Sequence, residues 1–205
     1  HKISQTIKIG ANVLLTKKDY NKRNSSVFNQ ALKAGPIGKL YEDDGVTYRP
    51  IPDLVFAYNQ NSPMLDEVEG AASRIINNTR VFSNLYAEWN ILPSLTFKST
   101  LGIDISTNKD GQFNGPKSLS QATVGKSISS LSYSDNFGYT LDNTLNYSKR
   151  FGIHNIQALA GTSTQYSRGQ SLSVTTSGQA TPSTLWYDQN YVNNSTTTST
   201  WSPYQ

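Results

Sequence analysis

Apolar and polar residues alternate with a period of two in five stretches of the chain. In residues 95–105, one face carries Leu, Phe and Ile with a single polar exception, Ser99, and the other face carries Thr, Lys, Gly and Asp. This is the period of a β-strand, whose successive side chains point to opposite faces. The pattern predicts strands at residues 5–16, 81–91, 95–106, 137–148 and 154–166.

The connections between these strands are of two kinds. Residues 90–94, with Pro93, and residues 149–153, with Gly152, are short enough for tight turns. Residues 18–80, 106–136 and 167–205 are long and polar. Tight turns at one end and long loops at the other are typical of an outer-membrane β-barrel, and the loops are then extracellular.

Alternation alone does not distinguish a membrane barrel from a soluble sandwich, because a half-buried strand in either has one apolar face. Each run has about the 9–11 residues that a tilted membrane strand requires. Trp89, Tyr147 and Phe151 lie beside the short turns, where a membrane-interface girdle of aromatic residues is expected. Ordinary strand aromatics are the alternative. A soluble carbohydrate-binding β-sandwich module remains the second interpretation.

Composition excludes several other classes. The chain has 205 residues, 36% of them hydrophobic, and a mean hydropathy of -0.50. No apolar run approaches the ~18 residues of a membrane-spanning helix. The absence of cysteine excludes disulfides, thiol catalysis and cysteine-based zinc sites. The net charge is +4, but the basic residues are scattered except for a group near residues 17–23, so nucleic-acid binding is not predicted.

Catalytic and metal-binding patterns are also missing. The chain has two histidines, and neither a Gly-x-Ser-x-Gly elbow nor a glycine-rich phosphate loop occurs. We therefore predict a protein that is not an enzyme and has no cofactor. Acidic clusters at residues 42–44 and 66–69 lack the spacing of a calcium-binding EF-hand loop. We interpret them as solvated loop faces and predict no metal site.

Aromatic residues among Asn, Gln, Ser and Thr in the long loops are candidates for ligand contact. Sugar rings stack on aromatic rings while amides and hydroxyls bond their edges. Packing of the loops against each other or against a partner is the alternative. The candidates are Tyr41, Tyr48, Phe56 and Tyr58 in the first loop, and Trp186, Tyr187, Tyr191 and Trp201 in the last.

Particular segments resemble a known family. Residues 95–104 and 144–161 are similar to strands of SusC/RagA-type TonB-dependent outer-membrane transporters of Bacteroidetes-like bacteria. The order of residues 29–36, Tyr41 to Gly45, and an Asn-rich segment at Pro63 is similar to a long mid-barrel loop of that family. The resemblance covers most of residues 6–165. The chain departs from the family in placing Ser62 between Asn61 and Pro63, and the tail after Ser167 shows no resemblance.

The resemblance implies an all-β fold, an antiparallel transmembrane β-barrel segment contributing about five strands to a plugged barrel of about 22. Five strands cannot close such a barrel, and their edges would be unpaired in lipid. The chain also begins at His1 without a visible leader. We therefore expect an internal barrel fragment from which the plug domain is absent.

The function implied by the resemblance is that of an importer in the outer membrane of a Gram-negative cell. Its substrate would be an oligosaccharide or a peptide. The expected partners are a SusD-like surface lipoprotein, TonB through the missing N-terminal part, the remaining barrel and plug, and outer-membrane lipids.

Overall fold

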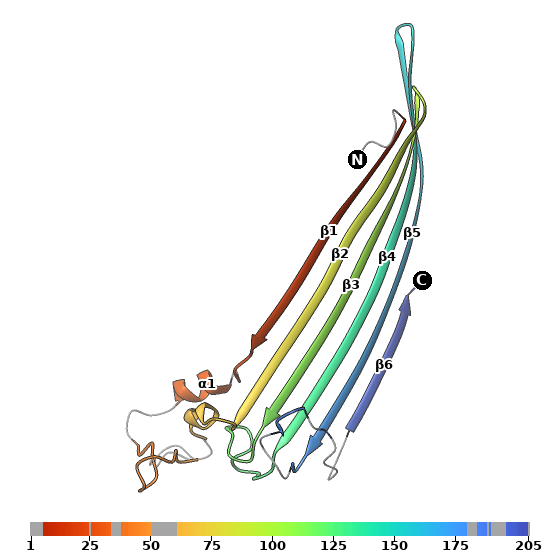
Figure 1. The fold of residues 1–205 in the computed structure, drawn as a ribbon. Coiled ribbons are helices and arrows are strands. Elements are labelled where there is room, and N and C mark those ends of the chain that lie inside the picture. Colours follow the sequence, from red (N-terminus) through yellow and green to blue (C-terminus); the bar gives the residue numbers. More distant parts are fainter. Residues whose placement is uncertain are drawn as a thin grey trace.

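A computed structural model of the chain describes residues 6–24, 26–33, 38–50, 61–179, 184–187, 189 and 196–204. These residues form one antiparallel sheet in which six strands follow each other in sequence order, together with two short helices. The sheet is a long, curved ribbon (Figure 1). The elements are β1 (Ile7–Asn21), α1 (Ser26–Lys33), the 3-10 helix η1 (Pro63–Glu67), β2 (Ala72–Leu92), β3 (Leu95–Asn114), β4 (Ile128–Phe151), β5 (His154–Ser177) and β6 (Thr196–Tyr204).

Two tight turns join the strands in hairpins. Pro93 and Ser94 connect β2 to β3, where a proline needs no ladder partner. Gly152 and Ile153 connect β4 to β5, and Gly152 has a φ of 60°, a conformation that favours glycine. Both turns lie at one end of the sheet, and α1 with the long connections lies at the other (Figure 1). We call these the turn end and the loop end.

The strands are longer than predicted. β4 and β5 each have 24 residues, or about 80 Å at about 3.3 Å per residue. β1 to β5 all continue into segments that we expected to be loops, such as residues 106–114 of β3. Alternation disappears there because Ser, Thr, Asn and Lys occupy both faces, whereas backbone pairing continues. The loop bounds 18–80, 106–136 and 167–205 are therefore too wide.

A sixth strand lies within the predicted last loop. β6 pairs with β5 from Ser167 opposite Tyr204 to Thr175 opposite Thr196. Its sequence is rich in threonine, a β-branched residue that favours strands. It lacks the apolar alternation on which the prediction was based.

The described strands make a single layer rather than two packed sheets, so the sandwich interpretation is wrong. Buried apolar residues within the described chain occur only at the loop end. They are Leu65, Ala71, Ile76, Phe113, Leu119 and Trp186. Among the described residues, neither helix has the length and hydropathy needed to cross a membrane.

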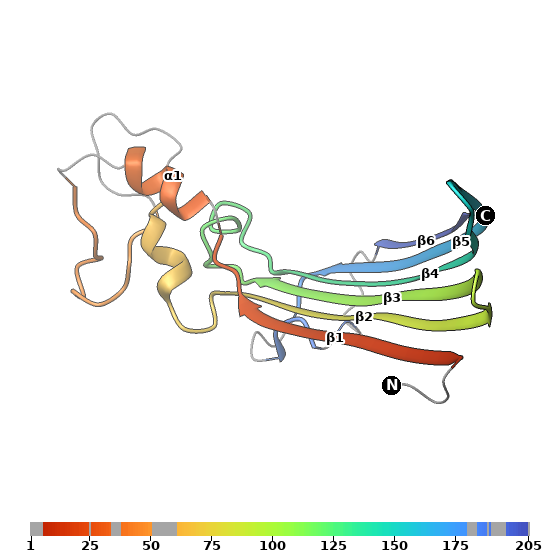
Figure 2. The ribbon, with the colours of Figure 1, turned by 90° about the horizontal axis from the view of Figure 1, so that it is seen from above.

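The indole of Trp186 is the largest aromatic group packed at the loop end. It is 3% exposed, lies over Gly111 of β3, and stacks on Tyr187 with ring centroids 4.0 Å apart. The Lys109 ammonium is 5.1 Å from the indole centroid. Figure 2 shows this C-terminal connection on one side of the sheet and α1 beyond the ends of the strands. Trp186 therefore packs the face of the loop end that carries Gly111.

We expect Gly111→Ala to destabilise the loop end. The new Cβ would overlap the Trp186 ring, which is buried and cannot move without unpacking its loop. Overpacking of this kind costs about 1–3 kcal/mol. Urea denaturation in detergent micelles should show the loss. Gly138→Ala is the matched control, because a Cβ there meets nothing nearer than the Tyr166 carbonyl oxygen at 3.5 Å. Equal midpoints for the two variants would contradict the packing.

Candidate functional site

The register places the alternating apolar residues of the long strands on one face. Side chains there are exposed or half-buried, with Val13 and Leu15 each 67% exposed. No described segment covers this face between the row that contains Ile7 and the row that contains Leu15. The chain therefore presents an apolar band along this face. From the turn end to the loop end, three of its rows are Ile7–Trp89–Phe97–Leu145, Ala11–Leu85–Leu101–Leu141 and Leu15–Val81–Ile105–Phe137.

Aromatic residues lie at both ends of the apolar band. Trp89 and Tyr147 occupy the turn end, followed by Phe151, whose ring centroid is 5.0 Å from the Lys149 ammonium. Phe137 and its aromatic neighbours occupy the other end. About ten residues separate Tyr147 from Phe137, or about 33 Å of strand. At a tilt of about 40° this spans about 25 Å, the height of the apolar band of a membrane barrel.

The second aromatic level was missed by sequence reasoning. It consists of Phe137, Tyr139 and Tyr166, and the rings of the two tyrosines stack 5.6 Å apart. The Arg168 guanidinium lies 5.8 Å from the Phe137 centroid. The available signal was the position of these aromatics at the far end of the same alternating face.

The opposite face is polar and carries ion pairs. Lys8 Nζ is 2.8 Å from Glu88 Oε1. The Arg80 guanidinium binds Asp104 through two contacts, Nε to Oδ1 at 2.9 Å and Nη2 to Oδ2 at 2.5 Å. Charged groups need water or paired partners, so this face suits an aqueous space. Around Gly138 it contains a hollow of about 370 Å³.

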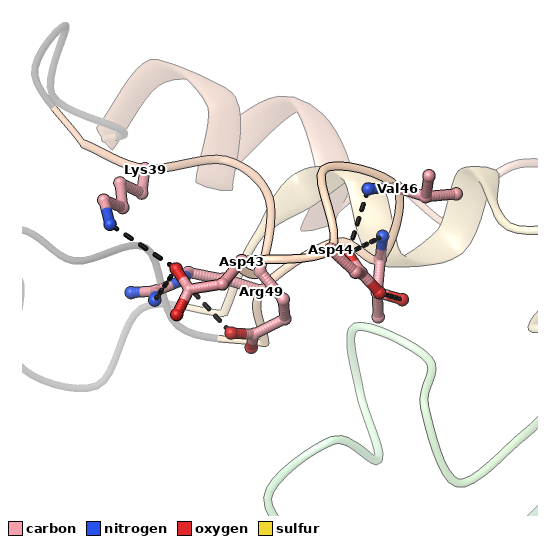
Figure 3. A network of polar contacts seen from close by, with 7 residues as sticks. Lys39, Asp43, Asp44, Val46 and Arg49 are labelled. Carbon is pink, nitrogen blue, oxygen red and sulfur yellow. Dashed lines mark hydrogen bonds and ion pairs between the residues drawn. The ribbon is translucent and has the colours of Figure 1, made fainter.

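A small β-hairpin of residues 40–49 lies at the loop end (Figure 1), and Figure 3 shows its polar contacts. Its backbone pairs Leu40 with Arg49 and Glu42 with Thr47. At its tip, Asp44 Oδ1 accepts hydrogen bonds from the N–H groups of Val46 at 2.9 Å and Thr47 at 2.8 Å. The hydrogen bond from the Thr47 hydroxyl, followed by these two backbone bonds, lowers the pKa of Asp44 below its ordinary value of 3.8. The turn is therefore preformed.

The acidic clusters are engaged in contacts within the protein. Arg49 Nε is 3.3 Å from Glu42 Oε2, and Lys39 Nζ is 3.5 Å from Asp43 (Figure 3). In the second cluster, Asp66 Oδ1 accepts a hydrogen bond from the Leu119 N–H at 2.7 Å. The described part of the chain contains no group of three or more His, Asp or Glu residues that could hold a metal ion.

The loop aromatics that we predicted as ligand contacts do not form one site. Tyr41 and Tyr48 stack in the hairpin with centroids 5.0 Å apart, and their hydrogen bond is the main reason that the pKa of Tyr48 is raised. Trp186 is buried in packing, while Tyr187 beside it is 66% exposed. The side chains of the remaining candidates are not described. Phe56, Tyr58 and Tyr191 lie outside the described residues, and Trp201 is described only through its backbone in β6.

Comparison with known proteins finds two sequence relatives that are TonB-dependent receptors. TonB-dependent receptor P3 of Formosa agariphila is 28% identical over 140 residues, and TonB-dependent receptor P39 of the same organism is 31% identical over 144; each match covers 68% of this chain and 13% of the relative. The chain is homologous to TonB-dependent receptors. No family model matches it.

Solved structures agree with this homology. The RagAB peptide transporter matches 98% of the chain with a TM-score of 0.70 and 17% identity. The RagAB peptide importer in the closed-closed state matches 99% with a TM-score of 0.70 and 19% identity. Each match covers 23% of the solved chain. The sheet therefore has the fold of part of the wall of a RagA-type barrel, which confirms the predicted fold class.

The homology also bears on location and chemistry. TonB-dependent receptors reside in the Gram-negative outer membrane and are not a family of enzymes. The apolar band is then the lipid-facing side of the receptor wall and the polar face its lumen. The strands of about 80 Å extend well beyond a hydrocarbon layer of about 30 Å.

We expect Ala11→Arg to impair assembly of the receptor and Asn12→Arg to be tolerated. These neighbours lie on β1 near the middle of the band, but Ala11 faces lipid and Asn12 faces the lumen. An arginine on the lipid face at the bilayer midplane costs about 2–4 kcal/mol. Urea unfolding in lipid vesicles measures the difference. The opposite order of stability would mean that the two faces are assigned the wrong way round.

We expect Asp44→Ala to loosen the hairpin and Asp44→Asn to preserve it, since asparagine can still accept from the N–H groups of Val46 and Thr47. Amide hydrogen exchange over residues 38–50 should be faster in the alanine variant. In the wild type the carboxylate's contribution is present above its ordinary pKa and is lost as pH falls through its lowered value. Unchanged exchange in Asp44→Ala would contradict a preformed turn.

Proposed function

We propose that this chain forms part of the barrel wall and some of the extracellular loops of a TonB-dependent importer that takes up oligosaccharides or peptides. The observation that carries the proposal is the two-faced sheet. Its apolar side matches lipid, whereas its other side offers paired charges, amides and hydroxyls to an aqueous lumen. A wall of this kind surrounds a path for polar solutes.

The proposed partners follow from the homology. The chain spans 13% of the length of the curated relatives and 23% of the solved chains, so plug, TonB contact and the other strands belong to the rest of such a receptor. TonB would supply the energy for uptake. RagAB is described as a peptide transporter, and this supports a peptide as one of the two substrate classes.

A SusD-like surface lipoprotein is the proposed partner at the loop end. The hairpin of residues 40–49 and the helix α1 are both exposed there, and α1 shows Phe28 at 69% and Leu32 at 70%. Exposed apolar side chains one helical turn apart suit a protein contact. Tyr41, Tyr48 and Tyr187 are then contacts for the substrate or for this lipoprotein. Trp89, Tyr147 and Phe151 form the inner-leaflet part of the aromatic girdle.

Replacing residues 39–49 by two glycines in the receptor tests this function. We expect the barrel to assemble at normal amounts, because the hairpin is outside the sheet ladder. Recovery of the lipoprotein with the receptor should fall about tenfold, as expected when a segment with aromatic contact residues is removed. Uptake of labelled oligosaccharides and peptides should fall with it. Asp44→Asn is the control.

If uptake and lipoprotein recovery are both unchanged, the loop has no part in capture. If the intact receptor takes up neither class of substrate, the proposed function itself is wrong.

A further inference from the structure

Two glycines, Gly102 and Gly138, line the hollow on the lumenal face of β2 to β5. Gly138 on β4 pairs with Asp104 on β3 and with Ser167 on β5, and the register through it is continuous. A Cβ at Gly138 would meet nothing nearer than the Tyr166 carbonyl oxygen, 3.5 Å away. Glycine weakens a strand interior and often marks the close approach of a ligand. The sheet therefore gives up packing here without any distortion.

The walls of the hollow are lined by side-chain amides. Asn84 Oδ1 lies 3.1 Å from where a Cβ on Gly102 would be, so this amide covers the neighbouring glycine. The Asn136 amide donates to the Ser106 hydroxyl at 3.4 Å. Gln165 closes the hollow on the β5 side. Each amide offers both donors and an acceptor, so it can donate a hydrogen bond to a ligand or accept one from it.

The charges of the hollow disfavour an anion. Asp104 is neutralised by its two contacts with Arg80. Asp142 accepts a hydrogen bond from the Ser163 hydroxyl at 2.6 Å and, as a carboxylate, keeps further acceptor capacity. Asp142 thus faces the space as a carboxylate that has no ion pair among the described residues. Phe82, 39% exposed, adds an aromatic ring at the β2 side.

These groups suit a sugar better than a peptide. At this level β3 and β4 have a hydrogen-bonded strand on both sides, so no backbone edge is open for a peptide to extend the sheet. Only side-chain amides, hydroxyls and carboxylates are offered. Hydroxyls of a sugar both donate and accept, and the apolar face of its ring can stack on Phe82.

We propose that the hollow around Gly138 is a subsite for one ring of a neutral oligosaccharide in the lumen. This inference rests on the proposed import function. The volume of about 370 Å³ lies at the lower end of the roughly 300–1,000 Å³ of small-molecule sites, which fits one ring rather than a longer segment.

The test fills the hollow in the intact receptor purified in detergent. Gly138→Leu places a side chain in the space, and Gly138→Ser places a smaller one there. Ser134→Leu is the matched control, since it lies on the same strand and face but outside the hollow. The probes are maltotetraose, cellotetraose, xylotetraose and penta-alanine, with affinity measured by calorimetry. Barrel assembly of every variant is checked by heat-modifiable gel mobility.

We expect at least one neutral tetrasaccharide to bind the wild type, with affinity reduced about tenfold in Gly138→Leu, less in Gly138→Ser, and unchanged in Ser134→Leu; tenfold corresponds to about 1.4 kcal/mol. Equal affinity in the wild type and both Gly138 variants would overturn the subsite while leaving import intact. Binding of penta-alanine alone, weakened by Gly138→Leu, would overturn the sugar assignment. Binding of no tetrasaccharide would overturn the proposal. Uptake assays in cells report separately on the import function.

Discussion

Uninterrupted backbone pairing is the constraint on which the rest of this structure depends. In hydrocarbon an unpaired N–H or C=O costs several kcal/mol, because no water is available to replace its partner. The strands therefore pair residue by residue across the apolar band. That register also assigns every side chain to lipid or lumen, since a slip of one residue would exchange the two faces. The tight turns at Pro93 and Gly152 hold it in two hairpins.

A second consequence is that one sheet is stabilised in two different ways. At the level of the band, the described chain buries no apolar side chain, and the favourable transfer of residues such as Leu85 and Val13 is to lipid. At the loop end the same strands pack like a water-soluble protein, with Phe113 and Trp186 buried against loops that cover the sheet. The loops are therefore anchored to the wall by a small core of their own.

This division explains what the sequence could predict. Alternation identified the parts of five strands that have lipid on one face and water on the other, because there the two faces must differ in polarity. It failed for residues 106–114 and for β6, where both faces are polar and the strand continues through backbone pairing alone. The hairpin at Asp44 follows a local Asx pattern, whereas the burial of Trp186 depends on Gly111, which is distant in sequence. Local patterns cannot show such contacts.

The strand glycines show the same limit at the level of function. Gly10, Gly111 and Gly138 each lie inside a paired strand. The space above Gly10 is filled by the Tyr86 ring and that above Gly111 by the Trp186 ring, while that above Gly138 is open. In the first two, glycine makes room for the protein's own aromatic residue, and the wall is sealed. At Gly138 no side chain of the described residues fills the space, so the strand loses packing there. The amides and the carboxylate around this space suit a polar molecule in the lumen.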